Sequence, residues 1–414
     1  MLSEQGPFWP QKDGSLAKNQ YAWNNNANMI FVEQPCGVGF SYSSAEDTKE
    51  DYTYDDDQAA EDFFSVIEGW LERFPDYAKN DLYLTSESYG GHYLPTLAKY
   101  IVDYGAGGNT ALNGNFRGFM VGNPATDKYS TTPAMIDTWY GHQLVSKPLY
   151  DTYQAKCSDP KDEAKNAQDC EMMMLKMFEQ VDGLNSYALD YGVCVDDDSS
   201  SKKKARSAQA KKLLHHNLKT GFSDSTLSKL GLASIDGSQQ PAYDACIDNY
   251  MIDYLNRDDV KKALNVKSDI TWSECAYNVH YSVTDKMLKN SAPYYTYLME
   301  NNDKFNVDVL VFSGDDDSVC GTVGTQSWIY GLGFDTKKGQ DWKEWKIDGQ
   351  MAGFTVQFTG QGSRFAFATV HNAGHEVPTY QPQAALGLFQ AYLSKKVFSE
   401  SSEDKPDYKP KTNM

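Results

Sequence analysis

Three short polar motifs contain the residue types with which proteins attack an acyl carbon. Ser88 lies in the motif Ser-Glu-Ser-Tyr-Gly-Gly, Asp317 in Gly-Asp-Asp-Asp-Ser, and His375 in Gly-His-Glu-Val-Pro. A serine on a tight turn between a strand and a helix exposes its hydroxyl, and the helix N-terminus favours negative charge that develops there. A histidine can take the proton of such a serine, and an aspartate can orient the histidine. The three motifs together therefore predict nucleophilic catalysis.

Each motif follows a segment with the apolar pattern of a buried strand. These segments are 82–85, 307–312 and 365–370. Strands that alternate with helices are typical of a mostly parallel sheet covered by helices on both faces. The order Ser, Asp, His, with each residue at the carboxyl end of a strand, is that of an α/β-hydrolase triad. We therefore predict an α/β-hydrolase fold.

Each motif by itself also has a simpler explanation. Ser88 alone is better explained as a helix N-cap, and an aspartate cluster alone as a solvated turn. The joint occurrence at three strand ends, in the correct order, favours the triad. His92 is the other candidate base, but a residue four positions after the nucleophile points into the following helix. Five further histidines have no comparable position at a strand end: His142, His215, His216, His280 and His371.

Other periodic segments extend the α/β pattern on both sides of an interruption. We expect buried strands at 28–32, 116–121 and 354–358, and helices at 55–74, from 93 and from 382. No clear strand occurs at 129–249, and its methionines at 172–177 are expected to pack a core. The predicted organisation is a first core part at 1–128, a helical cap at 129–249 with an exposed loop at 196–212, a second core part at 250–398 and a disordered tail at 399–414.

Composition limits the partners of the chain. Its 414 residues include 38 Lys and Arg against 57 Asp and Glu, a net charge of −19. This surplus argues against nucleic acid or an anionic membrane as the main partner. No apolar run approaches the roughly 18 residues of a membrane span. The seven cysteines include no Cys-x-x-Cys pair, so we predict a disulfide framework and neither a metal site nor a cofactor.

Ordered motifs occur along nearly the whole chain. They include Ser-Glu-Gln-Gly-Pro-Phe at 3–8, Phe-Val-Glu-Gln-Pro at 31–35, Gly-Val-Gly-Phe-Ser-Tyr at 37–42, Glu-Ser-Tyr-Gly-Gly-His-Tyr at 87–93, Gly-Asn-Pro at 122–124, Tyr-Leu-Asn at 254–256, Ser-Gly-Asp at 313–315 and Ala-Gly-His at 373–375. In these motifs the chain resembles the serine carboxypeptidases of the yeast carboxypeptidase Y, plant and cathepsin A type. The resemblance implies Ser88 as nucleophile, His375 as general base and acid, and Asp317 as the residue that orients the histidine. It implies the Tyr89 backbone N–H as an oxyanion donor.

The resemblance also implies a substrate and a pH range. Peptide or protein C-termini are the expected partners, with Glu4, Glu87 and Glu376 binding substrate. Two carboxyl groups that share a buried site cannot both ionise easily, so one is expected to stay protonated and to donate to the substrate's terminal carboxylate at acidic pH. Two alternatives remain, a serine carboxypeptidase-like acyltransferase and a catalytically impaired homologue that acts as a binding protein. A homodimer is left open.

The cysteines and the chain start carry further expectations. The resemblance implies the disulfides Cys157–Cys170 and Cys194–Cys246, and we hypothesise a third between Cys36 and Cys320. Cys275 is expected to form a disulfide with the cysteine of a Gly-Gly-Pro-Gly-Cys-Ser-Ser loop. By the resemblance, this loop and a signal peptide are expected ahead of residue 1. The implied location is the secretory pathway, with a vacuolar, lysosomal or extracellular destination. The loop at 196–212 is a predicted site of maturation cleavage. In the motif before Ser88, the chain has Ser86 where the family normally has a glycine.

Overall fold

A computed structural model describes residues 1–45, 51–106, 112, 114–159, 163, 165–195, 243–281, 290–301, 306–360, 364–398 and 407–408. Within these residues a central sheet has the strand order β11-β8-β9-β10-β7-β5-β4. Its strands are β4 Leu82–Glu87, β5 Phe116–Gly122, β7 Asp308–Gly314, β8 Lys343–Ile347, β9 Gln350–Phe358, β10 Phe365–Val370 and β11 Asp407–Tyr408. Two small sheets pair β1 (Phe8–Pro10) with β2 (Leu16–Lys18) and β3 (Thr53–Tyr54) with β6 (His280–Tyr281).

The parallel part of the sheet brings four strand ends to one edge. β4, β5, β7 and β10 are parallel neighbours, whereas β9 runs antiparallel to both β10 and β8. In the register of these pairs, Glu87 lies opposite Gly122, Gly122 opposite Phe312, and Gly314 opposite Val370. The segments that follow β4, β5, β7 and β10 therefore begin at the same edge, where functional groups of such sheets gather.

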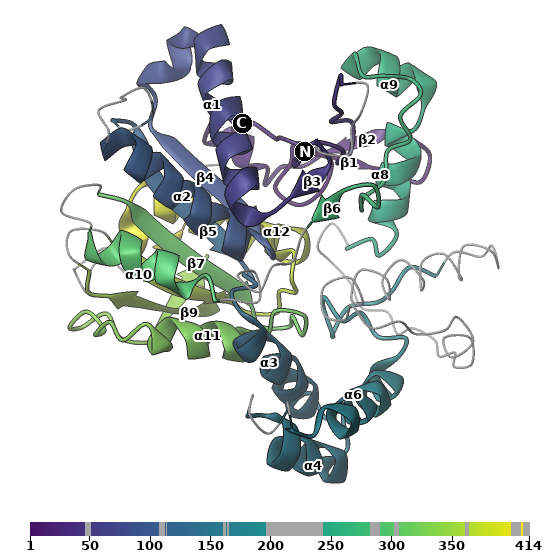
Figure 1. The fold of residues 1–414 in the computed structure, drawn as a ribbon, viewed down its shortest axis with the longest axis vertical. Helices are drawn as coiled ribbons and strands as arrows, with labels where there is room; N and C mark the ends of the chain where they lie inside the picture. Colours follow the sequence, from purple (N-terminus) through teal and green to yellow (C-terminus); the bar gives the residue numbers. More distant parts are fainter. Residues whose placement is uncertain are drawn as a thin grey trace.

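Alternating side chains of the strands fill two cores, one on each face of the sheet. In β7, Val309 and Val311 pack on one face, and Leu310 and Phe312 on the other, because successive side chains of a strand point to opposite faces. The first core is covered by α1 (Asp56–Arg73), α2 (Gly90–Ala106), α10 (Ala292–Glu300) and α11 (Thr322–Gly331). Figure 1 shows α2, α10 and α11 in front of the strands. The second core is covered by α12 (Val377–Tyr380) and α13 (Pro382–Leu393).

Three helices beyond the sheet share a separate core. α3 (Lys128–Gly141), α4 (Lys147–Cys157) and α6 (Ala167–Val181) extend away from the sheet at the bottom of Figure 1. Trp139 of α3 packs there with Met177 of α6, and Met173 and Met174 are buried beside them. The expected packing role of the methionines is therefore confirmed for these three, while Met172 is half exposed.

The remaining elements are short. They are α8 (Ile247–Leu255), α9 (Asp258–Leu264), η1 (Trp23–Asn25), η2 (Pro75–Lys79) and η3 (Lys396–Phe398). The expected strand at 28–32 is wrong: the segment has no regular structure, and Ile30, Phe31 and Val32 are 50, 37 and 36% exposed. An apolar segment becomes a buried strand only when a neighbouring strand or helix covers it. No described strand pairs with residues 28–32.

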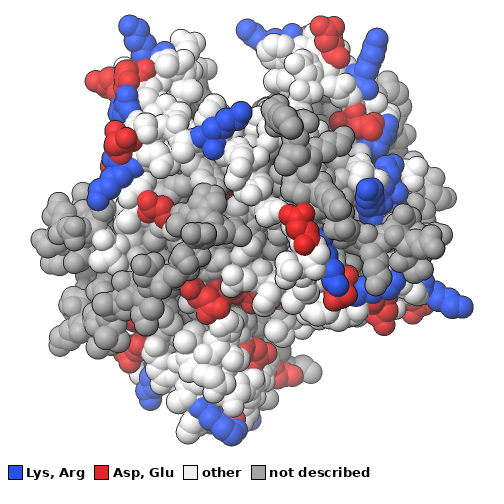
Figure 2. Space-filling model, turned by 180° about the vertical axis from the view of Figure 1, so that it is seen from behind, with Lys and Arg blue, Asp and Glu red and all other residues white. Residues whose placement is uncertain are grey.

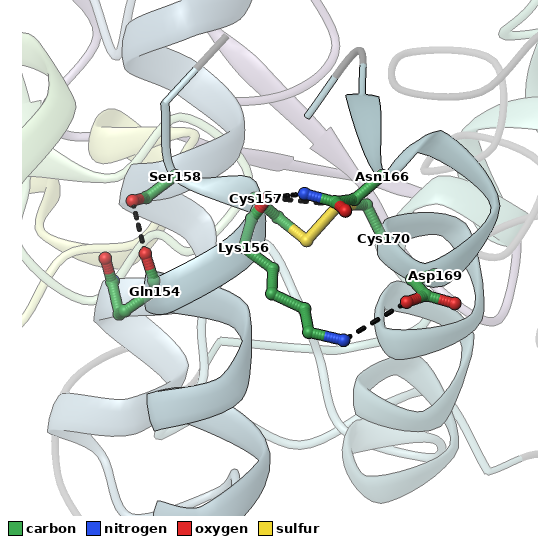
Figure 3. The surroundings of a disulfide bond; sticks show 7 residues. All are labelled: Gln154, Lys156, Cys157, Ser158, Asn166, Asp169 and Cys170. Carbon is green, nitrogen blue, oxygen red and sulfur yellow. Dashed lines mark hydrogen bonds and ion pairs between the residues drawn. A yellow bond between two sulfur atoms is a disulfide. The ribbon is translucent and has the colours of Figure 1, made fainter. Parts of the chain in front are cut away.

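Two of the three disulfides expected within the chain are confirmed, and the third is wrong. Cys157–Cys170 joins α4 to α6, beside an ion pair between Lys156 and Asp169 at 3.2 Å (Figure 3). Cys194–Cys246 joins the segment after α6 to the start of α8. No disulfide joins Cys36 to Cys320. The Cys320 sulfur instead lies within 4.8 Å of ligand atoms of Asp317 and His375.

Several expectations concern residues that the structure does not describe. The loop at 196–212 and its predicted cleavage lie outside the described residues, as does the tail at 399–414 except for the two residues of β11. The division into core and cap stays a prediction, and so does the partner of Cys275.

In the described part of the chain, no helix is long and apolar enough to cross a membrane. Lys and Arg lie mostly near the outline of the face in Figure 2 and do not merge into one basic patch.

Candidate active site

Ser88 occupies a strained turn directly after β4. Its backbone has a left-handed φ of 56°, which non-glycine residues rarely adopt, and its N–H donates to the carbonyl of Gly122 at 2.9 Å. A Cβ at position 90 would lie 2.4 Å from the Ser86 hydroxyl, and one at position 91 would lie 2.2 Å from the carbonyl oxygen of Ala125. Glycine is thus required at both positions. The turn accommodates Ser86 because position 90 carries no side chain.

His375 and Asp317 form a buried pair at the same edge of the sheet. Nδ1 of His375 lies 2.7 Å from Oδ2 of Asp317, and the two residues are 3 and 0% exposed. The Asn123 side chain donates to Asp317 Oδ2 at 2.8 Å, and the backbone N–H of Val319 donates to Oδ1 at 2.7 Å. The carboxylate is therefore held from several sides, and Nε2 of His375 is left for a substrate or nucleophile.

Asp315, the other candidate acid, contacts a different histidine. Its Oδ2 lies 2.7 Å from Nδ1 of His371, and its Oδ1 accepts the backbone N–H of Asn372 at 2.7 Å. Both side chains of this pair are exposed. The two aspartates therefore have different roles. Asp317 contacts the buried His375, whereas Asp315 holds the surface turn at His371 and Asn372.

The nucleophile and the base are brought to one edge by the strand register. No hydrogen bond between the Ser88 hydroxyl and His375 occurs in the described part of the chain; such bonds are often long in free enzymes and tighten with substrate. The Tyr89 N–H, expected as an oxyanion donor, donates to no carbonyl among the described residues. It stands just before α2, where the helix dipole favours negative charge.

Glu4, Glu87 and Glu376 form one cluster. Their carboxylate oxygens lie within 4.8 Å of one another, and the Glu4 and Glu87 carboxyl groups share a hydrogen bond. Burial, and then the charges of Glu4 and Glu376, raise the pKa of Glu87 well above its ordinary value. Burial also raises the pKa of Glu4, although the bond to Glu87 opposes this. Burial therefore favours the protonated form of both carboxyl groups, and most strongly that of Glu87.

Asp56 is a member of the site that the sequence analysis missed. Its Oδ1 accepts hydrogen bonds from the hydroxyls of Tyr89 and Tyr281, each at 3.0 Å, and its Oδ2 lies 3.2 Å from Nδ1 of His92. The Tyr89 ring stacks on His92 with centroids 4.7 Å apart. These contacts hold Tyr89, whose N–H is the candidate oxyanion donor. They also occupy Nδ1 of His92, the alternative base. Only the acidic start of α1 could have signalled Asp56.

Two further neighbours of the triad were not singled out as site residues. Asn123, within the Gly-Asn-Pro motif, both donates to Asp317 and accepts the backbone N–H of Gly314 at 3.0 Å. Cys320 is buried beside Asp317 and His375. Burial, and then the negative charges of Asp317 and Glu87, raise the pKa of the Cys320 thiol well above its ordinary value. The sulfur therefore remains a protonated thiol and cannot compete with Ser88 as a nucleophile.

Comparisons with known proteins show the family and the fold of the chain. The family model for serine carboxypeptidases matches residues 1–395. The chain is 33% identical over 402 residues to serine carboxypeptidase-like 25 of Arabidopsis thaliana, covering 94% of this chain and 77% of that protein. It is 32% identical over 408 residues to serine carboxypeptidase 24 of the same plant, covering 96 and 79%. A prohormone-processing carboxypeptidase from Saccharomyces cerevisiae superposes with a TM-score of 0.72 at 18% identity, covering 95% of this chain and 79% of that one.

The chain belongs to the serine carboxypeptidase family, and its fold is the α/β-hydrolase fold. The family match over nearly the whole chain and the structural likeness establish both points, as the sequence predicted.

Proposed function

We propose that this protein is a serine-type carboxypeptidase that releases single amino acids from peptide C-termini. The observation that carries the proposal is the Glu4–Glu87 pair beside the turn of Ser88, since a protonated glutamic acid there can donate to the terminal carboxylate of a peptide. Family membership supports the same reaction class. Two disulfides in the described residues favour an oxidising compartment of the secretory pathway, such as the vacuole, the lysosome or the cell exterior.

The proposed reaction proceeds through an acyl-enzyme. Ser88 Oγ attacks the scissile carbonyl carbon while Nε2 of His375 accepts its proton, and Asp317 stabilises the resulting imidazolium. The Tyr89 N–H donates to the oxyanion of the tetrahedral intermediate. Collapse breaks the C–N bond, and His375 returns the proton to the leaving amine. Water then attacks the ester with His375 as base, which releases the shortened peptide and restores Ser88.

Substrate orientation follows from the charges of the cluster. The C-terminal carboxylate of the peptide would accept a hydrogen bond from the Glu87 carboxyl group, which places the last peptide bond next to Ser88. Glu376, directly after the catalytic histidine in the chain, adds negative charge and would favour a basic C-terminal side chain. An ionised Glu87 would repel the terminal carboxylate, so binding requires a pH below the raised pKa of Glu87.

One experiment on the full-length protein separates the candidate functions. A fluorophosphonate should label wild-type protein at Ser88 and leave a Ser88→Ala variant unlabelled. The unlabelled wild-type protein should release free amino acids from peptides with a C-terminal carboxylate, and labelling should abolish this release. Transfer of the acyl group of an activated acyl ester to an added alcohol, with no release of amino acids from peptides, would identify an acyltransferase instead. Failure of the folded protein to react with the probe would indicate a binding protein.

A further inference from the structure

A third cluster of potential ligand atoms lies outside the triad and the glutamate cluster. It consists of His142, Asp190 and Asp316, whose ring nitrogen and carboxylate oxygens lie within 4.8 Å of one another. His142 directly follows α3, Asp190 precedes the disulfide at Cys194, and Asp316 lies in the turn after β7. Three distant segments of the chain therefore present side chains to one point.

Backbone hydrogen bonds hold these segments together. The Asp190 N–H donates to both carboxylate oxygens of Asp316, at 3.2 and 3.0 Å, and the Leu189 N–H donates to the Asp316 carbonyl at 3.2 Å. The His142 N–H continues the bonding of α3 by donating to the carbonyl of Thr138 at 2.9 Å. Backbone N–H groups thus tie Asp190 and Leu189 to Asp316, whereas His142 is placed by the end of α3.

The cluster carries negative charge that no nearby cation offsets. Asp316 is only 2% exposed, and within the described residues neither it nor Asp190 forms an ion pair with Lys or Arg. The His142 ring takes part in no hydrogen bond or ion pair with a described residue. A buried carboxylate beside a second carboxylate and an uncommitted imidazole is an arrangement that a cation would stabilise.

We propose that His142, Asp190 and Asp316 bind a divalent transition-metal ion of the zinc type. One imidazole and two carboxylates suit zinc, which is commonly held by three protein ligands and a water molecule, whereas calcium and magnesium prefer oxygen ligands alone. Zinc–ligand bonds of about 2.0–2.2 Å require donor atoms within about 4 Å of one another. Rotation of the exposed Asp190 and the half-buried His142 closes the remaining gap.

The ion would connect three parts of the molecule that surround the catalytic acid. Asp316 precedes Asp317, and its own N–H donates to the carbonyl of Ala373, two residues before His375, at 2.9 Å. The neighbouring Ser318 is bonded to α3 through the indole of Trp139 at 3.0 Å. Metal bound at Asp316 would thus stabilise the turn that positions the catalytic carboxylate. The role is structural and does not require the ion to contact substrate.

Metal titration of the full-length, chelator-treated protein tests the proposal. Zinc should bind with one-to-one stoichiometry in calorimetry and raise the Tm, because a hundredfold excess over the Kd multiplies the folding equilibrium constant by about 100. His142→Gln and Asp190→Asn should each weaken binding about tenfold or more and remove the rise in Tm. His371→Gln is the matched control, since it alters another histidine of the same region and should leave binding unchanged.

The two other ligand clusters make specificity part of the test. Zinc could bind Asp317, Cys320 and His375, or the three glutamates, so cobalt serves as a second probe. Cobalt at the proposed site should show d–d absorption without a thiolate-to-cobalt charge-transfer band. A thiolate band, a rise in Tm that persists in both variants, or the absence of binding to wild-type protein would each overturn the proposal. Peptidase activity is not needed for any of these readings.

Discussion

Replacing Glu87 by glutamine keeps the shape of the side chain and its ability to donate a hydrogen bond, but removes its titration. In the wild-type protein the pKa of Glu87 is raised by burial and by the charges of Glu4 and Glu376. Below this raised pKa the carboxyl group is protonated and can donate to a peptide carboxylate. As pH rises through it, the donor is lost and a negative charge replaces it. KM for peptide acids should therefore rise with pH in the wild type and stay flat in Glu87→Gln.

The size of the effect follows from one hydrogen bond to a charged acceptor. Such a bond contributes about 1.5–3 kcal/mol, which corresponds to about 10–150-fold in KM. Glu376→Gln is the informative companion variant. It removes a negative neighbour that raises the pKa of Glu87, so the loss of binding should occur at lower pH without disappearing.

Initial rates for a peptide acid and its C-terminal amide, measured across pH, provide the assay. The amide lacks the carboxylate that Glu87 would contact, so its KM should show no such rise in any variant. Identical alkaline limbs for the acid and the amide in the wild type would refute the reasoning. A KM that still rises with pH for the acid in Glu87→Gln would refute it equally.

Further substitutions test the triad, the support of Tyr89 and the helical extension. Asp317→Asn should lower kcat about ten-thousandfold, whereas Asp315→Asn, which removes only an exposed contact, should leave kcat nearly unchanged in the same assay. Asp56→Ala leaves two tyrosine hydroxyls without their acceptor and should lower the free energy of unfolding by about 2–4 kcal/mol in urea titrations. Serine at both Cys157 and Cys170 removes a crosslink across 13 residues and should cost about 3 kcal/mol of stability, a loss that reduction of that bond in the wild type should reproduce.

Strand positions were predictable where the sheet buries both faces of a strand. The mostly apolar segments at 116–121 and 365–370 correspond to β5 and β10, because strands buried on both faces consist mainly of apolar residues. The equally apolar segment at 28–32 gave a wrong prediction, since its side chains are exposed and no described strand pairs with it. The local sequence shows which segments are apolar enough to be buried. Whether a segment is buried depends on strands or helices from elsewhere in the chain.

Candidate site residues were predictable when a local motif carried them. Ser88 and His375 could be nominated from small neighbours and chain order alone. Asp56 could not, because its contact with Tyr281 spans 225 positions and no spacing rule connects the two. The Cys36–Cys320 hypothesis failed for a related reason. Both cysteines follow segments that were expected to be strands, but a disulfide also requires Cα atoms about 4.4–6.8 Å apart, and sequence position does not determine that distance.

Three consecutive aspartates show how surroundings assign different chemistry to one residue type. Asp315 is exposed and bonds to His371, so it can fasten a surface turn but cannot reach the buried histidine. Asp316 is buried with a single backbone N–H as its partner, and its pKa rises to about 7. Asp317 is buried too, but it accepts from the Asn123 side chain, from two backbone N–H groups and from His375. Only this last arrangement provides enough donors for a buried carboxylate to stabilise the imidazolium that forms when Ser88 gives up its proton. The position of the acid therefore follows from the donors that converge on it, and a shift of one residue along the turn would remove them.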